Sequence, residues 1–362
     1  MSTRTKPSAA TVALEPYGLE RFAVALACAQ GMHADDAATL AEILLRCDLR
    51  GIRSHGMVRL PVYLRRMAAG GIDPAATPEI VRESGATALV DAHNANGHVA
   101  ARFAMRKAIE LAERHGIGAV GERNSNHFGP SGEYALQAAA AGMIGIVSTN
   151  AAPCMAPWGG IAPILGNNPI AFAAPRADGD PFVLDFALSQ VAKGWVRLAF
   201  AAGRAIPAGW AMDAQGRPTT DAAAAMKGLL NPIGAYKGTG LSIAMDILCG
   251  ILVGSTASAD LPHQENVALP GNVGHFFIAI QIERFIAPDE FERSVGALLD
   301  RVEGARRAPD TDAILIPGKI EGDKERAAAA RGYVELAAET WSELLREAER
   351  LGVGAPTPLP AR

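Results

Sequence analysis

The chain has 362 residues, of which 49% are hydrophobic and 20% charged. A chain of this length can bury a sizeable core and suffices for one large or two ordinary domains. Its 34 lysine and arginine residues against 38 acidic residues give a formal net charge of −4. Because this balance leaves no basic surplus for a phosphate backbone or an anionic lipid surface, we expect neither nucleic acid nor membrane as a partner.

The sequence carries no pattern typical of export or membrane insertion. Residues 1–18 include positive charges but lack the apolar run of a secretory signal. The most apolar later stretch, residues 241–254, contains Asp246 and would extend only about 20 Å as a helix, which is short of a bilayer. We therefore expect a cytoplasmic protein. Its four dispersed cysteines predict buried reduced thiols rather than a zinc motif: Cys28, Cys47, Cys154 and Cys249.

The N-terminal part of the sequence predicts helices. Apolar residues follow helical spacing over residues 17–50, and the Gly-Gly-Ile-Asp-Pro sequence at 70–74 then interrupts the pattern. Residues 88–90 predict a short strand, and residues 98–115 return to a helix. Gly116 follows where a C-terminal cap belongs.

A helix, a glycine and a strand occur in this order twice in succession. The first strand covers residues 117–120 and leads into the polar loop 122–127. The second covers residues 144–148 and leads into the loop 149–153. Loops carried by a rigid strand are common positions for functional sites, so both are candidates.

The remaining sequence predicts the overall organisation. Proline and glycine crowd residues 153–181, which favours short strands and turns, and helical spacing returns from residue 289 onward. The order is thus helical, mixed α/β and helical again. We expect residues 1–75 and residues 290–362 to be helical, and residues 76–289 between them to form an α/β domain.

The standard nucleotide and metal motifs are absent. Gly116, Gly118 and Gly121 have the G-x-G-x-x-G spacing, but they follow a predicted helix and open a strand, the reverse of the order that binds a pyrophosphate. No Walker lysine motif occurs. His93 and His98 are five residues apart and share neither a helix face nor a strand face, so we expect no catalytic metal.

The segment from Arg53 to Pro61 is more informative. Ser54 is a good helix N-cap, and His55 and Arg59, four residues apart, would share one face of the helix. Arg59 could bind a substrate carboxylate through two hydrogen bonds, while His55 exchanges a proton with the oxygen on the neighbouring carbon. The alternative is a capped surface helix with a solvated arginine and histidine.

Other polar segments offer ligand-binding groups. The loop from Arg123 to Gly132 combines hydroxyl, amide and imidazole groups with N–H donors at a predicted helix start, so it could hold phosphate or ribose, or be a plain turn. Asp185 ends an apolar run and could orient an imidazole or cap a helix. Lys237 lies in the glycine-rich loop 234–240, ahead of a predicted helix at 242–252, and could reach a phosphate or a carboxamide.

Several of these motifs occur together, in order and at matching spacing, in one known family. They are Ser54-His55-Gly56 with Arg59, residues 125–129, 166–169, 185–187, 218–221 and 236–238. From about residue 17 to residue 345 the sequence resembles the malate/L-lactate dehydrogenase family of the non-Rossmann type. This family also includes ureidoglycolate and sulfolactate dehydrogenases and reductases of diketogulonate and piperideine-2-carboxylate.

The resemblance implies an α/β (α+β) protein with a non-Rossmann NAD(P)-binding fold. Its central sheet would be mixed, and its helical domain would be formed from both chain ends. The implied activity is hydride transfer between NAD or NADP and a small 2-hydroxy or 2-keto acid, in a homodimer.

The resemblance also implies roles for individual residues. His55 would donate or accept the proton, supported by Ser54 and Asp185, and Arg59 would bind the substrate carboxylate. His127 has the acid-base role in parts of the family, so the assignment between the two histidines stays open. The implied cofactor-binding residues are His127, Phe128, Gly129, Pro130, Ser131, Asn168, Pro169, Asp185, Phe186, Ala187 and Lys237.

Two departures from the family pattern bear on the substrate. Thr239 stands where many members have an aromatic residue, and Trp195 stands where a small or polar residue is common. Within the family, the nearest alternative is a cyclic imine reductase. A non-catalytic ligand-binding protein is a further alternative, which the histidine, arginine, aspartate and lysine set disfavours. A hydrolytic Ser54, His55 and Asp185 triad is disfavoured because adjacent side chains rarely bond in the needed geometry and no G-x-S-x-G sequence occurs.

Overall fold

The structure, a computed structural model, describes residues 10–360 and falls into two compact units. The first combines the described parts of residues 1–75 and 319–362, and the second covers residues 76–318. The C-terminal contribution to the first unit thus begins later than residue 290. Helix α9 (Pro288–Glu303), which we expected in the helical domain, belongs to the second unit, where Asp300 pairs with Arg176 at 2.7 Å.

The first unit is helical, with one small sheet. Its helices are α1 (Pro16–Ala29), α2 (Ala34–Leu49), α3 (Leu60–Ala68), α10 (Lys319–Arg331) and α11 (Ala338–Leu351). The helical spacing of residues 17–50 corresponds to the two helices α1 and α2, which are separated at Gly31, where φ is 104°. The N-terminal and C-terminal parts of this unit pair with each other where β1 (Thr11–Leu14) runs antiparallel to β12 (Val334–Ala337).

A seven-stranded mixed sheet forms the centre of the second unit, in the order β2-β3-β4-β11-β5-β6-β7. Only β3 and β4 pair in parallel; every other pair is antiparallel. The predicted α/β class with a mixed sheet is thereby confirmed. The strands are β2 (Glu79–Ser84), β3 (Thr87–Asp91), β4 (Ile117–Ser125), β5 (Met143–Thr149), β6 (Ile170–Ala174), β7 (Phe182–Phe186) and β11 (Val273–Gln281).

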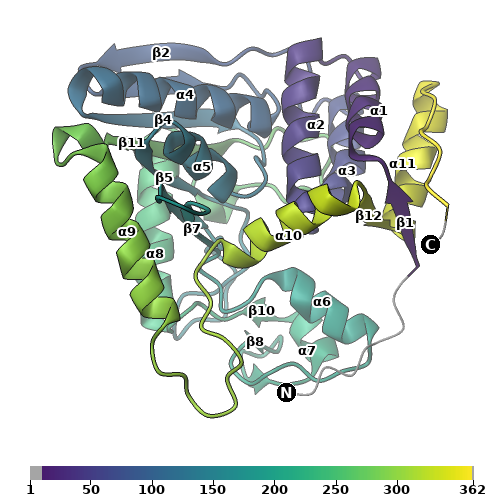
Figure 1. Ribbon diagram of the computed structural model, residues 1–362. Helices are drawn as coiled ribbons and strands as arrows, with labels where there is room; N and C mark the ends of the chain where they lie inside the picture. Colours follow the sequence, from purple (N-terminus) through teal and green to yellow (C-terminus); the bar gives the residue numbers. More distant parts are fainter. Residues whose placement is uncertain (1–9, 361–362) are drawn as a thin grey trace. The chain divides into compact units, whose positions relative to one another are not determined.

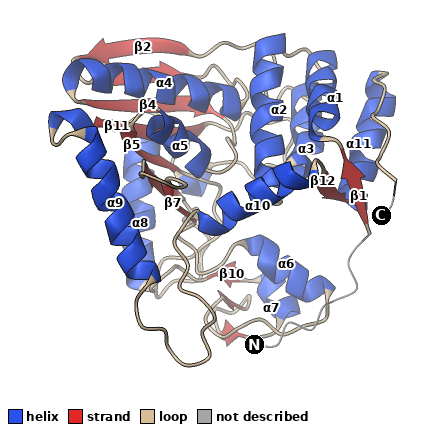
Figure 2. Ribbon diagram, in the orientation of Figure 1, coloured by secondary structure: helices blue, strands red, loops and turns tan. Residues whose placement is uncertain are grey.

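Helices α4 (Gly97–His115) and α5 (Gly132–Ala140) pack against this sheet (Figure 2). Glycines on the strands make the close approach feasible. A Cβ on Gly118 would overlap the carbonyl of Ala108 in α4, and a Cβ on Gly145 would lie 2.5 Å from the carbonyl oxygen of Ala135 in α5. Gly116 ends α4 in the left-handed conformation. These glycines therefore serve helix packing and capping, as their order in the sequence predicts.

A smaller layer of the second unit surrounds its own apolar core. Met155, Leu188 and Val196 are buried there. Its helices are α6 (Lys193–Ala201) and α7 (Ala222–Lys227), and its three short strands are β8 (Ala211–Met212), β9 (Pro218–Thr219) and β10 (Leu229–Leu230). The unit also contains α8 (Tyr236–Asp246), the π-helix η2 (Ile247–Ile251) and the 3-10 helices η3 (Ser258–Asp260) and η4 (Ile282–Arg284).

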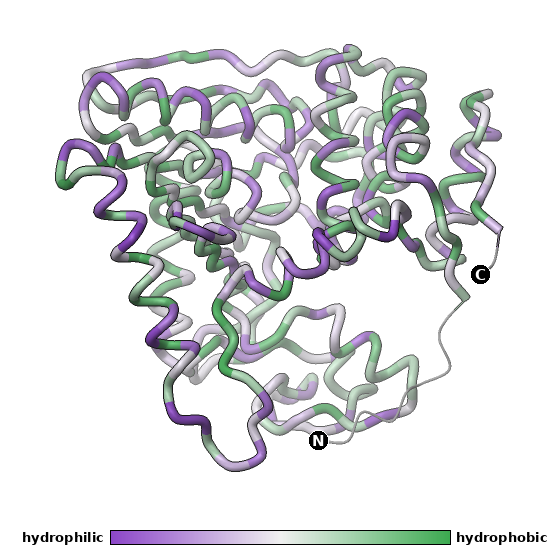
Figure 3. Tube along the Cα trace, in the orientation of Figure 1, coloured by the Kyte–Doolittle hydropathy of each residue, from purple (hydrophilic) through white to green (hydrophobic). Residues whose placement is uncertain are grey.

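Hydrophobic and hydrophilic residues are interspersed along the helices, as Figure 3 shows. Over residues 10–360, no helix combines the length and apolar character that crossing a membrane would require.

Candidate active site

The segment that carries Ser54, His55 and Arg59 lies in the first unit. It leads from α2 through a turn into the 3-10 helix η1 (Met57–Arg59) and then α3. The hydroxyl of Ser54 lies 2.9 Å from Nδ1 of His55, and Nε of Arg59 donates to the backbone oxygen of Ser54 at 2.7 Å. Two hydrogen-bond contacts within one turn thus link Ser54, His55 and Arg59.

Two sequence predictions about this segment are wrong. Ser54 caps no helix: the N-cap of η1 is Gly56, whose backbone, with φ −85° and ψ −148°, is not helical and interrupts the expected helix, so His55 and Arg59 do not share a helix face. The adjacent Ser54 and His55 side chains do make a hydrogen-bond contact, because the turn folds one back on the other. Adjacency of Ser54 and His55 therefore does not exclude a hydrolytic triad, whereas the absence of a G-x-S-x-G sequence still disfavours one.

The protonation state of His55 follows from its surroundings. Burial, and then the positive charge of Arg59, lower the pKa of His55 from 6.5 to about 4. The imidazole is therefore neutral at neutral pH and ready to accept a proton. The Arg59 guanidinium donates through Nε to the Ser54 carbonyl and suits a carboxylate.

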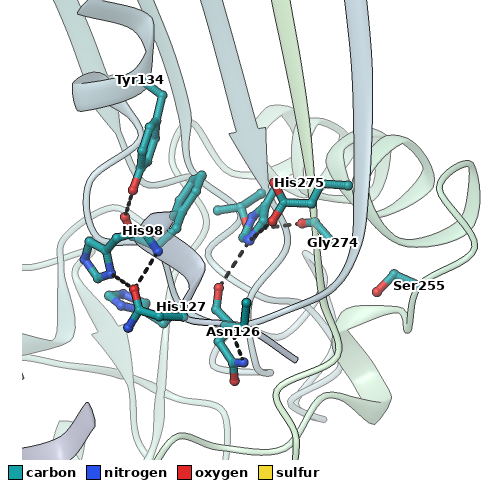
Figure 4. Close-up of polar contacts among 12 residues, drawn as sticks. His98, Asn126, His127, Tyr134, Ser255, Gly274 and His275 are labelled. Atoms are coloured by element: carbon teal, nitrogen blue, oxygen red, sulfur yellow. Dashed lines mark hydrogen bonds and ion pairs between the residues drawn. The ribbon is translucent and has the colours of Figure 1, made fainter. Parts of the chain in front are cut away.

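The second group of candidate residues follows β4 in the second unit, and Figure 4 shows its surroundings. His127 is partly exposed, and its Nδ1 accepts from the N–H of Gly129 at 3.4 Å. In the neutral ring this contact favours the proton on Nε2. Phe128 is buried and stacks on Tyr134, whose hydroxyl donates to the Phe128 carbonyl.

Three buried polar side chains on adjacent strands, here called the polar row, contact this loop. Glu122 on β4, His275 on β11 and Thr149 on β5 are register partners across three strands. Nδ1 of His275 lies 2.7 Å from the Thr149 hydroxyl, its Nε2 lies 3.2 Å from the Asn126 carbonyl, and its ring stacks on Phe128 at 4.2 Å. This row could not be predicted from the sequence, because the pairing of β11 between β4 and β5 is long-range.

Burial keeps both titratable groups of the row uncharged. It raises the pKa of Glu122 to about 8 and lowers the pKa of His275 to about 3. At neutral pH the row is thus a neutral acid beside a neutral imidazole.

Asp185 is the penultimate residue of β7 and is exposed, yet one of its oxygens accepts a hydrogen bond within the protein. Oδ2 accepts from the N–H of Gly132, the first residue of α5, at 2.8 Å. A carboxylate therefore occupies the helix start where we considered phosphate binding, and its charge disfavours a second anion there. Phe186 and Ala187, which follow, are half-buried.

Asn168 is fully buried, and its side-chain amide is fully engaged within the protein. Its oxygen accepts from the Ala151 N–H and the Ser258 hydroxyl, and its nitrogen donates to the backbone and hydroxyl oxygens of Ser242. The side chain therefore shapes the loop rather than offering groups to a ligand. Pro169, next to it, is partly exposed.

Lys237 lies in the first turn of α8 rather than in a loop, because this helix begins at Tyr236 and not at 242. The lysine is exposed. Thr239 accepts from the Trp158 N–H at 2.9 Å, so this departure from the family pattern ties a neighbouring loop to the helix. Trp195 is 60% exposed on α6. Among the described residues, no three His, Cys, Asp or Glu side chains are grouped so that they could hold a metal ion.

Comparison with known proteins supports the class that these features suggest. A model of the malate/L-lactate dehydrogenase family matches residues 15–345. Malate dehydrogenase of Pyrococcus abyssi is 41% identical over 306 residues, which is 82% of this chain and 84% of that protein. A delta(1)-pyrroline-2-carboxylate reductase of Burkholderia ambifaria is 36% identical over 267 residues, 74% of this chain and 77% of that protein.

A solved structure gives the same result for the fold. Sulfolactate dehydrogenase from Methanocaldococcus jannaschii matches with a TM-score of 0.89 at 36% identity, covering 94% of this chain and 98% of the other. The chain belongs to the malate/L-lactate dehydrogenase family. The resemblance stated from the sequence motifs is thus confirmed.

Proposed function

We propose that this protein is an NAD(P)-dependent oxidoreductase that interconverts a small 2-hydroxy acid and the corresponding 2-keto acid. The observation that carries the proposal is the turn in which Ser54 contacts His55 and anchors Arg59. It presents a fixed cation next to a neutral imidazole. A carboxylate and an oxygen on adjacent carbons match these two groups.

Each group of the turn has its own role in the proposal. Arg59 binds the substrate carboxylate and thereby orients the neighbouring carbon. His55 takes the hydroxyl proton in oxidation and returns it to the keto oxygen in reduction, while Ser54 fixes the ring through Nδ1. His127 is the alternative proton carrier, and its contact with Gly129 leaves Nε2–H as donor.

The second unit contains groups that fit a nicotinamide dinucleotide. The Ser131 hydroxyl is buried and, within the described part of the chain, has no hydrogen-bond partner, so a bound ligand would satisfy it. The exposed carboxylate of Asp185 suits ribose hydroxyls, and Lys237 suits a phosphate or a carboxamide. We assign cofactor binding to residues 127–131, 169, 185–187 and Lys237, with buried Asn168 holding the loop that carries Pro169. When bound, the nicotinamide supplies the hydride chemistry.

The chemistry shared by the relatives narrows the substrate class. The malate and sulfolactate dehydrogenases are named for 2-hydroxy acids, and the pyrroline-2-carboxylate reductase for a cyclic imine with a carboxylate on the reacting carbon. Arg59 serves either carboxylate. We favour the hydroxy acid because the malate dehydrogenase shares more identity over more of the chain, and keep the imine as second candidate.

The proposal extends to a homodimer located in the cytoplasm. Helix α8, η2 and the residue that follows η2 carry exposed apolar side chains: Leu241, Ile247, Ile251 and Leu252 are 46–65% exposed. Apolar patches of this kind on soluble proteins commonly mark association sites. We propose that a second copy of the chain covers this face.

A spectrophotometric assay of NADH and NADPH oxidation tests the proposed activity. The purified protein is given a panel of 2-keto acids and, separately, a cyclic imine carboxylate. Turnover of a keto acid supports the proposal and the two cofactor rates decide between NAD and NADP. Turnover of the imine alone would establish the second candidate, and absence of nicotinamide binding would contradict both.

A further inference from the structure

Asp48 lies one residue before the end of α2, a position where a negative charge is unfavourable for two reasons. The side chain is only 8% exposed. A negative charge in the last turn of a helix also opposes the helix dipole, which favours cations there. Burial raises the pKa of Asp48 to about 7, against the opposing influence of the Met57 N–H and the charge of Arg53.

The carboxylate of Asp48 is directed at the turn that carries His55. Its Oδ2 accepts from the backbone N–H of Met57, the first residue of η1, at 2.7 Å. The side chain that satisfies this helix start thus comes from the preceding helix, nine residues earlier, and no residue of the turn itself provides a cap.

The Asp48 carboxylate occupies the space that a side chain at position 56 would fill. A Cβ on Gly56 would overlap the carboxyl group of Asp48, so glycine is required for steric reasons at a backbone that is not left-handed. Gly56 lies between His55 and Met57. Contact with Asp48 therefore fixes the chain directly after the imidazole and directly before the helix that ends at Arg59.

We propose that Asp48 is a positioning residue of the enzyme, which holds the turn of Ser54, His55 and Arg59 through Met57 and Gly56. This inference rests on the proposed function of His55 and Arg59. Asp48 touches neither of the reacting groups, and its effect is exerted through the backbone. Because the required property is a hydrogen-bond acceptor at this place, asparagine can substitute for it and alanine cannot.

The test compares Asp48→Ala with Asp48→Asn and with the control Glu325→Ala. Glu325 pairs with Arg50 at the end of α2 at 2.8 Å, so its loss perturbs the same helix end without removing the contact to Met57. We expect Asp48→Ala to raise KM for the 2-keto acid about tenfold or more while KM for NAD(P)H is unchanged. Asp48→Asn and Glu325→Ala stay within about threefold of the wild type.

Two measurements do not depend on turnover. Hydrogen exchange in residues 52–59 accelerates in Asp48→Ala but not in Asp48→Asn or Glu325→Ala. NMR titration of labelled histidines, with His55 assigned through His55→Asn, shows the His55 pKa moving in Asp48→Ala from about 4 toward 6.5. If the wild type turns over no keto acid, the proposed function fails, while these two measurements still decide the role of Asp48.

Gly56→Ala provides an independent variant in case Asp48→Ala does not fold. The added methyl group displaces the carboxylate and should raise KM as Asp48→Ala does. In an Asp48→Ala background it should add little, because the overlapping group is gone. Unchanged KM and exchange in both single variants, or equal changes in Glu325→Ala, would overturn the proposal.

Discussion

Asp185 on β7 accepts a hydrogen bond from the N–H of Gly132 at 2.8 Å, so the carboxylate of one strand end lies at the start of helix α5. An anion at a helix N-terminus is stabilised by the unpaired N–H groups and the helix dipole. The contact also fixes β7 relative to the residues just before Gly132, which include Ser131 and the candidate cofactor loop.

Replacement of Asp185 by alanine should therefore affect both stability and cofactor binding. We expect a loss of about 1 kcal/mol in unfolding free energy, typical of a lost helix cap, and weaker binding of NAD(P)H. Asp185→Asn keeps an acceptor for Gly132 and should retain most of the stability. Thermal unfolding and fluorescence titration with the cofactor measure the two effects. Equal cofactor affinity in wild type and Asp185→Ala would remove Asp185 from the cofactor site.

Arg59→Lys tests the recognition of the substrate carboxylate. Lysine keeps the charge but loses the planar pair of donors and the Nε–H that bonds to the Ser54 carbonyl. We expect kcat/KM for the 2-keto acid to fall by about tenfold to a hundredfold, with cofactor binding unchanged. Steady-state kinetics gives the answer, and an unchanged kcat/KM would show that Arg59 does not bind substrate.

The pH dependence of the reaction should report the pKa of His55. The neutral imidazole accepts the proton in oxidation, and its pKa in the free enzyme is lowered to about 4. Oxidation should therefore gain kcat/KM as pH rises through about 4 and stay level around neutrality. Reduction needs the protonated ring and should weaken as pH rises above about 4. A profile that is the same in His55→Ala would assign the proton transfer to His127 instead.

The buried polar row predicts a pH-dependent stability. Burial raises the pKa of Glu122 to about 8, so the native state holds a proton there that the unfolded chain releases above its ordinary value of 4.5. This group therefore costs stability increasingly as pH rises from 4.5 toward 8. His275 acts in the opposite direction, but only below about pH 6.5, where the unfolded ring takes up a proton.

Glu122→Gln should accordingly raise the melting temperature at pH 8.5 by several degrees, corresponding to a few kcal/mol, and change it little near pH 4. The glutamine is neutral at every pH and of similar shape. Thermal unfolding at both values, with the exposed Glu290→Gln as control, separates this effect from general changes of charge. A gain of the same size at both pH values would contradict the prediction, because it would show that folding does not raise the pKa of Glu122.

Ile251→Asp tests the proposed homodimer. Ile251 is 65% exposed at the end of η2, and a charge there should prevent burial of the apolar face. We expect light scattering after gel filtration to give twice the chain mass for the wild type and the chain mass for the variant. Tyr17→Asp, at an exposed site of the first unit, should leave the mass unchanged. A monomeric wild type would contradict the proposal.

Local patterns predicted the elements whose signals lie within one segment. The helix at residues 98–115 matches α4 within one residue, because its apolar stripe and its terminal glycine agree. The strands after Gly116 and Gly142 were also predicted, although β4 runs five residues further, to Ser125, because it pairs with β11.

Features that depend on distant pairing could not be predicted. Neither the placement of β11 in the middle of the sheet nor the row of Glu122, His275 and Thr149 follows from spacing. In the sequence, nothing distinguishes Asp48 from other charged residues of a helix, because its contact with Met57 depends on the turn that follows. The sequence resemblance predicts that Asn168 contacts the cofactor, whereas the four hydrogen bonds of its side-chain amide are all made within the protein.

The most direct test of the central claim is the transfer of isotopic label. The enzyme is incubated with NADH or NADPH that carries deuterium at nicotinamide C4, on each face in turn, and with a 2-keto acid that it turns over. Mass spectrometry and proton NMR of the product follow the label. The proposal predicts one deuterium on C2 of the 2-hydroxy acid from one of the two faces. A product without deuterium from either face would contradict it.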